Sequence, residues 1–496
     1  MVSPLCIAAL AAATVFYTRS LWVTGFLAAA PLVVRLGIRL GMPQGTGTLF
    51  RKFRLFREEK GFPWLALYLG LCAGLFALPR VTALEPGLPV ERIVSLTGTL
   101  LDDPRTLPGG SSGFPGQGRG MAYLNLKKTE ALLPGTNGVR SSARGRIPVF
   151  FPAGTMDRVK DFGRGAELYV EGRFLPDRSG SGGISFTARS VHTVKAPPAP
   201  ETLRTAIRGS MLQRLGEKSW GGLAAALLLG SRENLEGDLA RAYRDAGLSH
   251  ILALSGMHLA FLSGLLTLAL KKPLGKRGAL TAGLGFIFLY VLLVGPQPSL
   301  VRSVIMYALG SCLVLSGTVR QPLALLGAAF LIQLLADPPS ALSISFILSY
   351  LALGGILILG GPLESLFRGS LPPPAAAGLA ASLGAFIATA PAVTAFFGVL
   401  RPLGIIAGFI AVPLSSGFMA LSIPGALNLP LADFPLDRLL DLWYLVLKRT
   451  MVFFSQLPAC RPGLRELWGF SAVVFAGILV VARKMARWRT YLAPFA

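Results

Sequence analysis

Long apolar runs fill both ends of this 496-residue chain, and a segment of short, alternating runs separates them. A helix needs about 20 apolar residues to cross the hydrocarbon core of a bilayer. Most of the runs approach that length, so the pattern predicts a membrane protein with several spans. We divide the chain into N-terminal helices with a basic loop (1–84), a β-rich domain (85–200) and a helix bundle (201–496).

The expected spans follow from the apolar runs. Two short segments before residue 40 and a run at 62–78 precede the β-rich domain. A run at 219–230 is too short to span by itself. The expected spans of the bundle are residues 248–270, 278–295, 299–317, 321–336, 341–360, 375–397, 402–425, 437–457 and 466–483.

The middle segment alternates polar and apolar positions, which is the period of a half-buried strand. The predicted strands are residues 93–100, 121–126, 147–151, 167–174 and 184–188. Five short strands in about a hundred residues favour a small barrel such as an OB-fold, and a β-sandwich is the alternative. Residues 195–200 are rich in proline and predict a stiff linker.

The composition supports a membrane location. Hydrophobic residues make up 52% of the chain and charged residues 15%, whereas soluble domains carry about 25% charged residues. Basic clusters at 51–60, 271–277 and 483–489 fall on one side of the expected spans, and the positive-inside rule assigns that side to the cytoplasm. We therefore predict a polytopic α-helical membrane protein with an inserted small all-β (OB-fold-like) extracytoplasmic domain.

The formal net charge is +24, from 48 Lys and Arg against 24 Asp and Glu. Part of this excess serves membrane topology. The rest indicates an anionic partner, either lipid headgroups or nucleic acid. Lys448 and Arg449 fall inside the run at 437–457, so we expect that helix to lie at the interface instead of spanning.

Histidine and cysteine are scarce in this sequence. The chain holds 3 histidines and 4 cysteines, and no CxxC pair is present. This supply predicts no disulfide framework, no metal site and no cofactor. A G-x-x-x-x-G-K-[ST] loop is also missing, so an ATP-driven motor would be a separate protein.

The most informative polar stretch opens the first long run of the bundle. It carries His250, Ser255 and His258, and on a continuous helix the two histidines would share one face. Arg302 lies in a later apolar run. Ionisable residues at membrane depth commonly line a wet pathway, so we interpret all four residues as pathway-lining. The alternatives are hydrogen bonds from the histidines to neighbouring helices and an interfacial position for Arg302.

Basic residues with aromatic neighbours recur in the β-rich domain. OB-folds bind single strands by stacking bases on aromatic rings beside a basic groove. The candidate DNA-binding residues of this domain are Lys127, Lys128, Arg144 and Arg146. Arg244 is a further candidate, at an external mouth of the pathway. The alternative is that Arg244 is an ordinary charged residue at the solvent-exposed end of a helix. The aromatic residues interleaved with these cations are Tyr123, Phe150, Phe151 and Tyr169. About half of their side chains must face the core, because strand residues alternate.

Three segments resemble motifs of the ComEC family, the inner-membrane channel proteins of natural transformation. Residues 250–258 are similar to its H-L-L-A-I-S-G-L-H motif, residues 298–306 to its P-x-x-R-A-x-x-M segment, and residues 346–350 to its F-Q-L-S-F segment. The order of helices, external β domain and helix bundle is also similar. The resemblance implies a multi-pass channel of the bacterial cytoplasmic (inner) membrane that translocates single-stranded DNA during DNA uptake.

The resemblance also implies partners and one difference. The partners would be single-stranded DNA, membrane lipid, a separate ATP-driven motor and DNA-receptor proteins. Assembly into a homo-oligomer is left open. Residues 408–413 lack the Asn that the family often places before a proline. Many members carry a metallo-β-lactamase-like nuclease domain with an H-x-H-x-D-H motif, which this sequence lacks. We therefore expect a channel and not an enzyme, with any nuclease on a free-standing polypeptide.

Two other functions stay open. A membrane-embedded enzyme would use His250 or His258 as a base, and Asp245 and Ser255 are the nearby groups that could complete its site. A transporter of small anions would use the same histidine pair. Inverted repeats would favour a transporter, and the sequence shows no convincing internal repeat.

Overall fold

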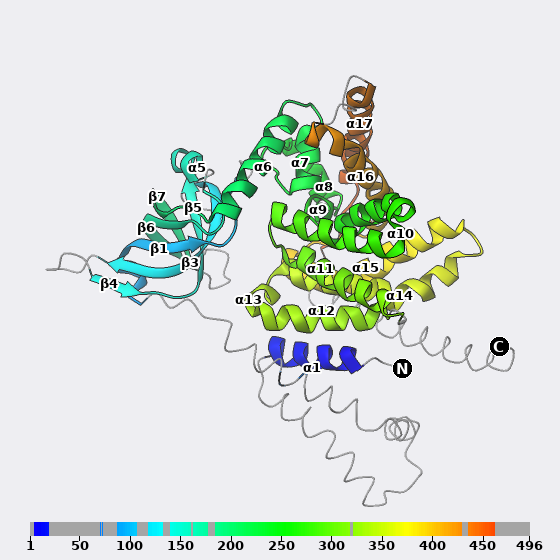
Figure 1. Ribbon diagram of the computed structural model, residues 1–496, viewed down its shortest axis with the longest axis horizontal. Helices are drawn as coiled ribbons and strands as arrows, with labels where there is room; N and C mark the ends of the chain where they lie inside the picture. Colours follow the sequence, from blue (N-terminus) through cyan, green and yellow to red (C-terminus); the bar gives the residue numbers. More distant parts are fainter. Residues whose placement is uncertain are drawn as a thin grey trace, which may run out of the picture.

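The computed structural model shows a β domain beside a larger helical part (Figure 1). It describes residues 4–18, 70, 72, 87–106, 118–131, 139–159, 162–176, 184–317, 321–428 and 435–461. The basic cluster at 51–60 and the expected span at 466–483 lie outside these residues, as does the run at 62–78 except for Gly70 and Cys72.

The β domain is a closed barrel of five long strands, in agreement with the alternating runs. Strand β1 pairs with both β3 and β6, and the ring continues from β6 through β7 and β5 back to β3. Of these pairings only β5 with β7 is parallel. Ring closure identifies an OB-like barrel and rules out the β-sandwich. The described strands are β1 (Ile93–Leu100), β2 (Arg105–Thr106), β3 (Gly118–Ala131), β4 (Val139–Ser142), β5 (Arg146–Pro152), β6 (Glu167–Pro176) and β7 (Ile184–Lys195).

Apolar side chains from the strands fill the barrel. Leu96 of β1 and Phe151 of β5 are fully buried. Helix α5 (Ala153–Val159) covers one end of the barrel through Met156. The Met156 Sδ atom lies only 2.1 Å from where a Cβ on Gly120 would be, so glycine permits this close approach.

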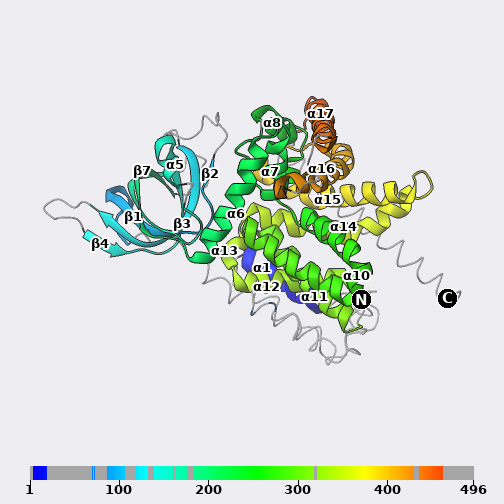
Figure 2. The ribbon, with the colours of Figure 1, turned by 45° about the horizontal axis from the view of Figure 1, so that its top comes forward.

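Helix α6 (Ala199–Gly216) connects the barrel to the helical part (Figure 2). It begins directly after Pro198, with Pro200 in its first turn. Proline fits there because its missing N–H group would have no helical partner. The expected linker at 195–200 is therefore shorter than predicted, since β7 continues to Lys195 and the helix starts at Ala199.

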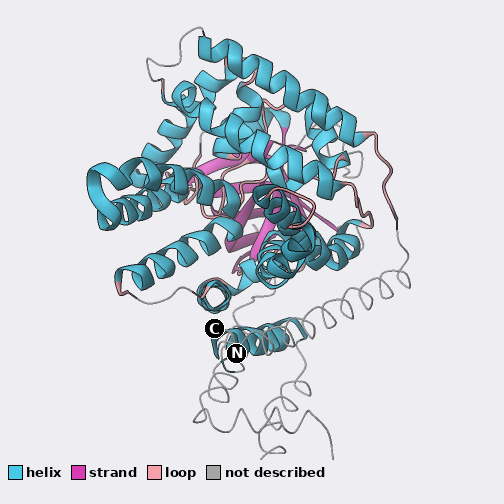
Figure 3. Ribbon diagram, turned by 90° about the vertical axis from the view of Figure 1, so that its right-hand side faces the viewer, coloured by secondary structure: helices cyan, strands magenta, loops and turns pink. Residues whose placement is uncertain are grey.

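Five described helices are long and apolar enough to cross a membrane, as expected for a multi-pass protein (Figure 3). They are α10 (Gly256–Val294), α11 (Pro298–Leu315), α14 (Ile344–Phe367), α15 (Pro373–Phe397) and α16 (Gly404–Leu427). The other described helices outside the barrel are α1 (Pro4–Thr18), α7 (Gly221–Leu229), α8 (Gly237–Asp245), α9 (Ser249–Leu252), α12 (Pro322–Ala336), α13 (Pro338–Ala341) and α17 (Pro435–Ser455).

Two helical segments meet inside α10. Gly275 interrupts the helix with a φ of 67°, a conformation that glycine adopts without a steric penalty. Lys272 and Arg277 flank this point, and both are exposed. The interruption therefore falls in the basic segment that separates the expected spans at 248–270 and 278–295.

Helices α7 and α17 have different surroundings. Every residue of α7 is buried, so the short run at 219–230 forms an interior helix.

Helix α17 buries Leu440, Leu447 and Met451 and is not among the five long apolar helices. Lys448 of α17 pairs with Glu236 before α8. Hydrogen bonds from Lys448 and Tyr444 lower the pKa of Glu236. The interfacial position of α17 stays a prediction.

A buried arginine joins the barrel to the helical part. Arg204 of α6 is 8% exposed and pairs with Asp103, which follows β1, and with Glu201. Its Nη1 also donates to the main-chain oxygen of Leu293, near the end of α10, at 3.3 Å. Burial raises the pKa of Asp103, but the hydrogen bond and charge of Arg204 outweigh burial and hold that pKa below its ordinary value.

A second ion pair joins the barrel to the helices on another side. Arg146 of β5 lies 3.3 Å from Asp337, which separates α12 from α13. Both side chains are largely exposed, so this pair contributes less than that of Arg204. The two pairs link the barrel to the helical part at two places.

We expect Arg204→Met to destabilise the protein by about 3 kcal/mol, because removal of one partner leaves a buried charge uncompensated. Denaturant unfolding of the purified protein measures this change. Arg140→Met is the control, since Arg140 is 74% exposed in its pair with Glu130 and should contribute below about 0.5 kcal/mol. Equal effects of the two substitutions would contradict the role of Arg204.

The stabilisation from the Arg204–Asp103 pair should decrease at acidic pH. The folded pKa of Asp103 lies below its ordinary value, which is about 3.9. The pair therefore contributes fully above about pH 4, and the contribution is lost as the pH falls through the folded pKa. The difference in unfolding free energy between wild type and Arg204→Met should shrink over that acidic range.

Candidate functional site

A break in the helical chain lies at the centre of the polar stretch. Helix α9 is followed by Ala253 and Ser255 in extended conformation, with ψ angles of 135° and 158°. Helix α10 begins only at Gly256. The prediction that His250 and His258 share one face of a continuous helix is therefore wrong.

A side chain of another helix compensates the break. The Ser299 hydroxyl of α11 donates to the main-chain oxygen of Leu254 at 3.0 Å. Interrupted helices are tolerated at membrane depth where other protein groups satisfy the freed backbone. Periodicity in the 248–270 run cannot reveal this hydrogen bond, because its donor comes from a distant part of the chain.

Arg302 lies in the second turn of α11 and is 7% exposed. Its Nη1 donates to the main-chain oxygen of Ser349 on α14 at 3.0 Å. Its guanidinium carbon lies 5.8 Å from the centre of the Tyr350 ring. In the described part of the chain no acidic side chain pairs with Arg302, and its Nε has no hydrogen-bond partner. Arg302 is therefore buried among helices.

The start of α10 packs directly against Arg302. A Cβ placed on Gly256 would lie 2.7 Å from Arg302 Nη2 and 2.0 Å from the Ser303 hydroxyl oxygen. Ser255 precedes Gly256, and its half-buried side chain has a hydroxyl oxygen without a partner among the described residues. The structure thus brings Ser255 and Arg302, which the sequence predicts as pathway-lining, to one point.

The two predicted histidines have different environments. His258 is completely buried in the first turn of α10, and neither ring nitrogen has a hydrogen-bond partner in the described structure. His250 on α9 is exposed, although it lies near enough to act electrostatically on His258. Ser255 and Arg302 meet at Gly256, and His258 follows Ser255 by three residues on α10. We name Ser255, His258 and Arg302 the polar cluster.

One polar residue near the polar cluster was missed in the sequence. Gln333 of α12 donates to the main-chain oxygen of Pro298 at 3.0 Å, and its side-chain oxygen accepts from the Tyr350 hydroxyl at 3.0 Å. These bonds tie α12 and α14 to the start of α11. A glutamine inside an apolar run was the signal that could have identified Gln333.

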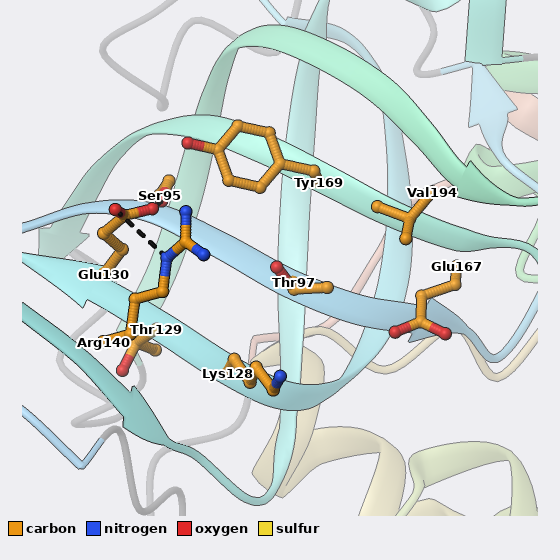
Figure 4. Close-up of a pocket in the computed structure, with 9 residues that line it drawn as sticks. All are labelled: Ser95, Thr97, Lys128, Thr129, Glu130, Arg140, Glu167, Tyr169 and Val194. Atoms are coloured by element: carbon orange, nitrogen blue, oxygen red, sulfur yellow. Dashed lines mark hydrogen bonds and ion pairs between the residues drawn. The ribbon is translucent and has the colours of Figure 1, made fainter.

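A shallow pocket of about 230 Å³ lies on the outside of the barrel (Figure 4). Tyr169 and Val194 supply its apolar wall, and Lys128 lies across from them. The remaining lining residues are Ser95, Thr97, Thr129, Glu130, Arg140 and Glu167. Lysine and arginine here face carboxylates, so the pocket has mixed charge and not a purely basic surface.

The four predicted DNA-binding residues of the barrel lie on its surface, and two of them are already in ion pairs. Lys127 pairs with Glu167 at 2.8 Å, and Arg146 pairs with Asp337. Lys128 and Arg144 are exposed and form no ion pair in the described structure. The barrel therefore leaves Lys128 and Arg144 as its freest predicted cations.

The fifth predicted DNA-binding residue is not on the barrel. Arg244 is exposed on α8, two residues before the segment that leads to α9. Its neighbour Asp245 accepts a hydrogen bond from Arg401 at 3.1 Å. Arg244 thus lies near the polar stretch in the chain, apart from the barrel cations.

Of the four predicted aromatic residues of the barrel, Phe151 belongs to the barrel core. Its neighbour Phe150 is also buried but lies outside that core cluster, so fewer than the expected half face the core. Tyr123 is 40% exposed, and Tyr169 lines the pocket. The two tyrosines are the rings that remain accessible for base stacking.

Comparison with known proteins now gives the family. The model of the Competence protein family matches residues 227–489, which include the polar cluster. The chain belongs to the Competence protein family. A role in DNA uptake during competence follows from this membership, and the predicted resemblance is confirmed.

Three relatives match different shares of the chain. ComE operon protein 3 of Bacillus subtilis is 31% identical over 167 residues, which are 33% of this chain and 21% of that protein. An uncharacterized protein of Aquifex aeolicus is 28% identical, over 62% of this chain and 74% of its own length. The uncharacterized protein YcaI of Escherichia coli is 26% identical, over 58% and 40%. Among solved structures none matches the chain.

We expect Gly256→Ala to destabilise the protein by about 2 kcal/mol, because the added methyl group overpacks the contact between α10 and α11. The melting temperature in detergent measures the change. Gly264→Ala is the matched control on the same helix, since no atom lies within 4 Å of its Cβ position. Alanine there should be neutral or stabilising by up to about 1 kcal/mol, and the same loss at both positions would contradict the proposed packing.

Proposed function

We propose that this protein is a channel that translocates single-stranded DNA across the cytoplasmic membrane during transformation. One observation carries the proposal: a guanidinium and several unpartnered polar groups are buried between apolar helices. Ionisable groups at membrane depth are expensive and mark pathways for polar substrates. A polyanion needs a lining with polar groups and positive charge.

The polar cluster would line this path. Arg302 contributes a permanent positive charge. Ser255 and His258 contribute polar groups that have no hydrogen-bond partner among the described residues. His250 stands nearby on the exposed surface of α9 and would act at the approach to the cluster. Arg244 on α8 would attract phosphate groups at the same approach.

The barrel would receive the DNA strand before it enters the bundle. It is an OB-like barrel with accessible tyrosines and exposed cations, which are the features that bind single strands without sequence preference. Its contacts through Asp103 and Arg146 hold it beside the helices. Receptor proteins and an ATP-driven motor would be partners of this channel.

We expect His258→Ala to lower uptake of labelled DNA by about tenfold, the factor that corresponds to one lost hydrogen bond to a charged group. The measurement is DNA entry into cells at equal protein level in the membrane. Thr394→Ala is the control, because the buried Thr394 hydroxyl bonds Ala390 within its own helix. Normal uptake by His258→Ala would assign His258 to packing alone, and normal uptake without the protein would refute the channel.

The barrel supports a second measurement. Residues 85–200 should bind single-stranded oligonucleotides, with a logarithmic affinity that falls linearly with the logarithm of salt concentration. We expect Lys128→Ala to reduce that slope by about 0.7, the value for one phosphate contact on a single strand. Lys127→Ala should change it less, because Glu167 already pairs with Lys127. Binding without salt dependence would contradict a role for the barrel as receiver.

A further inference from the structure

Two helices begin side by side at the polar cluster. Helix α10 starts at Gly256, and α11 starts at Pro298 and carries Arg302 in its second turn. The contact at Gly256 brings the Arg302 guanidinium against the first turn of α10. A permanent cation and a helix N-terminus therefore meet in the interior of the protein.

The first turn of α10 has unused donors. Its first helical hydrogen bond runs from the N–H of Leu259 to the oxygen of Ser255. The N–H groups of Gly256, Met257 and His258 form no backbone hydrogen bond in the described structure. Ser255 makes no side-chain cap, and the first turn contains no acidic residue. A helix start of this kind carries a partial positive charge and favours anions.

The guanidinium of Arg302 is only partly satisfied. Nη1 donates to the oxygen of Ser349, but Nε has no partner among the described residues. Among the described residues, only the ring of Tyr350 and the main-chain oxygen of Ser349 offset its charge. A buried charge without a counterion costs several kcal/mol of free energy. Binding of an anion beside Arg302 would therefore be favourable.

We propose that the first turn of α10, the Ser255 hydroxyl and Arg302 form a binding site for one phosphodiester group. The identification of the passing DNA strand as its source rests on the proposed function. The binding chemistry itself rests on the unpartnered donors. The same donors would bind any small phosphodiester monoanion that reaches them.

A phosphodiester matches this site in charge and shape. It carries one negative charge, which neutralises one guanidinium. Its two free oxygens can accept from the guanidinium and from the backbone N–H groups together, as in other arginine–phosphate contacts. The Ser255 hydroxyl adds one donor. A nucleobase would leave the charge of Arg302 uncompensated, so the site selects the backbone of the strand and not its sequence.

The site is closed in this structure, because Arg302 and His258 are buried. The extended residues Ala253 and Ser255 separate α9 from α10. Ser299 restrains this segment through its bond to Leu254.

The test uses the purified full chain and sodium dimethyl phosphate, the smallest phosphodiester monoanion. We expect dimethyl phosphate to raise the melting temperature of the wild type above that in sodium chloride of equal ionic strength. Arg302→Gln should abolish this rise. Ser255→Ala should weaken the apparent affinity by about tenfold, the effect of one hydrogen bond to a charged group.

Ser255→Ala keeps the test valid if Arg302→Gln does not fold, because the Ser255 hydroxyl has no partner to lose. Ser263→Ala is the matched control on α10, since the buried Ser263 hydroxyl already donates to the oxygen of Ala260. It should leave the dimethyl phosphate effect unchanged. An equal rise in wild type and Ser255→Ala, or no rise in the wild type, would overturn the site.

A second readout separates this site from the channel. If dimethyl phosphate binding depends on Ser255 while cells lacking the protein take up DNA normally, the anion site stands and the channel fails. If wild type shows no dimethyl phosphate effect while uptake requires the protein, the site is wrong and the channel stands. A phospholipid that co-purifies with wild type but not with Ser255→Ala would assign the site to a lipid headgroup and overturn its role for the strand.

Discussion

The burial of Arg302 among apolar helices constrains much of the bundle around it. A guanidinium in this setting needs hydrogen bonds and a polarisable neighbour, since Arg302 is only 7% exposed and no described acidic residue pairs with it. The carbonyl of Ser349 and the ring of Tyr350 supply part of this need from α14. Glycine at position 256 lets α10 approach the same group. Three long helices therefore converge on one side chain.

The attachment of the barrel is arranged around the same region. Arg204 binds Asp103 of the barrel and the end of α10, and Arg146 reaches the turn between α12 and α13. Gln333 connects α12 to Pro298 at the start of α11. The α10–α11 connection thus lies between two contacts of the barrel. Under the proposed function, a DNA strand held by the barrel would enter the bundle near this connection.

Much of the architecture could be predicted from the sequence because it depends on local periodicity. Alternation located the five long barrel strands, and β1 has the predicted limits of 93–100. Apolar runs located the long helices, since a membrane span needs a continuous apolar length. The break at Ala253 and the network of Gln333 escaped prediction, because hydrogen bonds from other helices stabilise them.

The sequence by itself determined the membrane class, the inserted β domain, the family motif and the presence of His258 and Arg302 in apolar runs. It also supplied the cations of the barrel. It could not tell that Lys127 and Arg146 pair with acidic residues, whereas Lys128 and Arg144 pair with none of the described ones. Only the tertiary structure decided that His250 and His258 belong to different helices. It alone placed Ser255 and Arg302 together, because contacts between residues far apart in the chain depend on how whole helices pack and not on the spacing within any one of them.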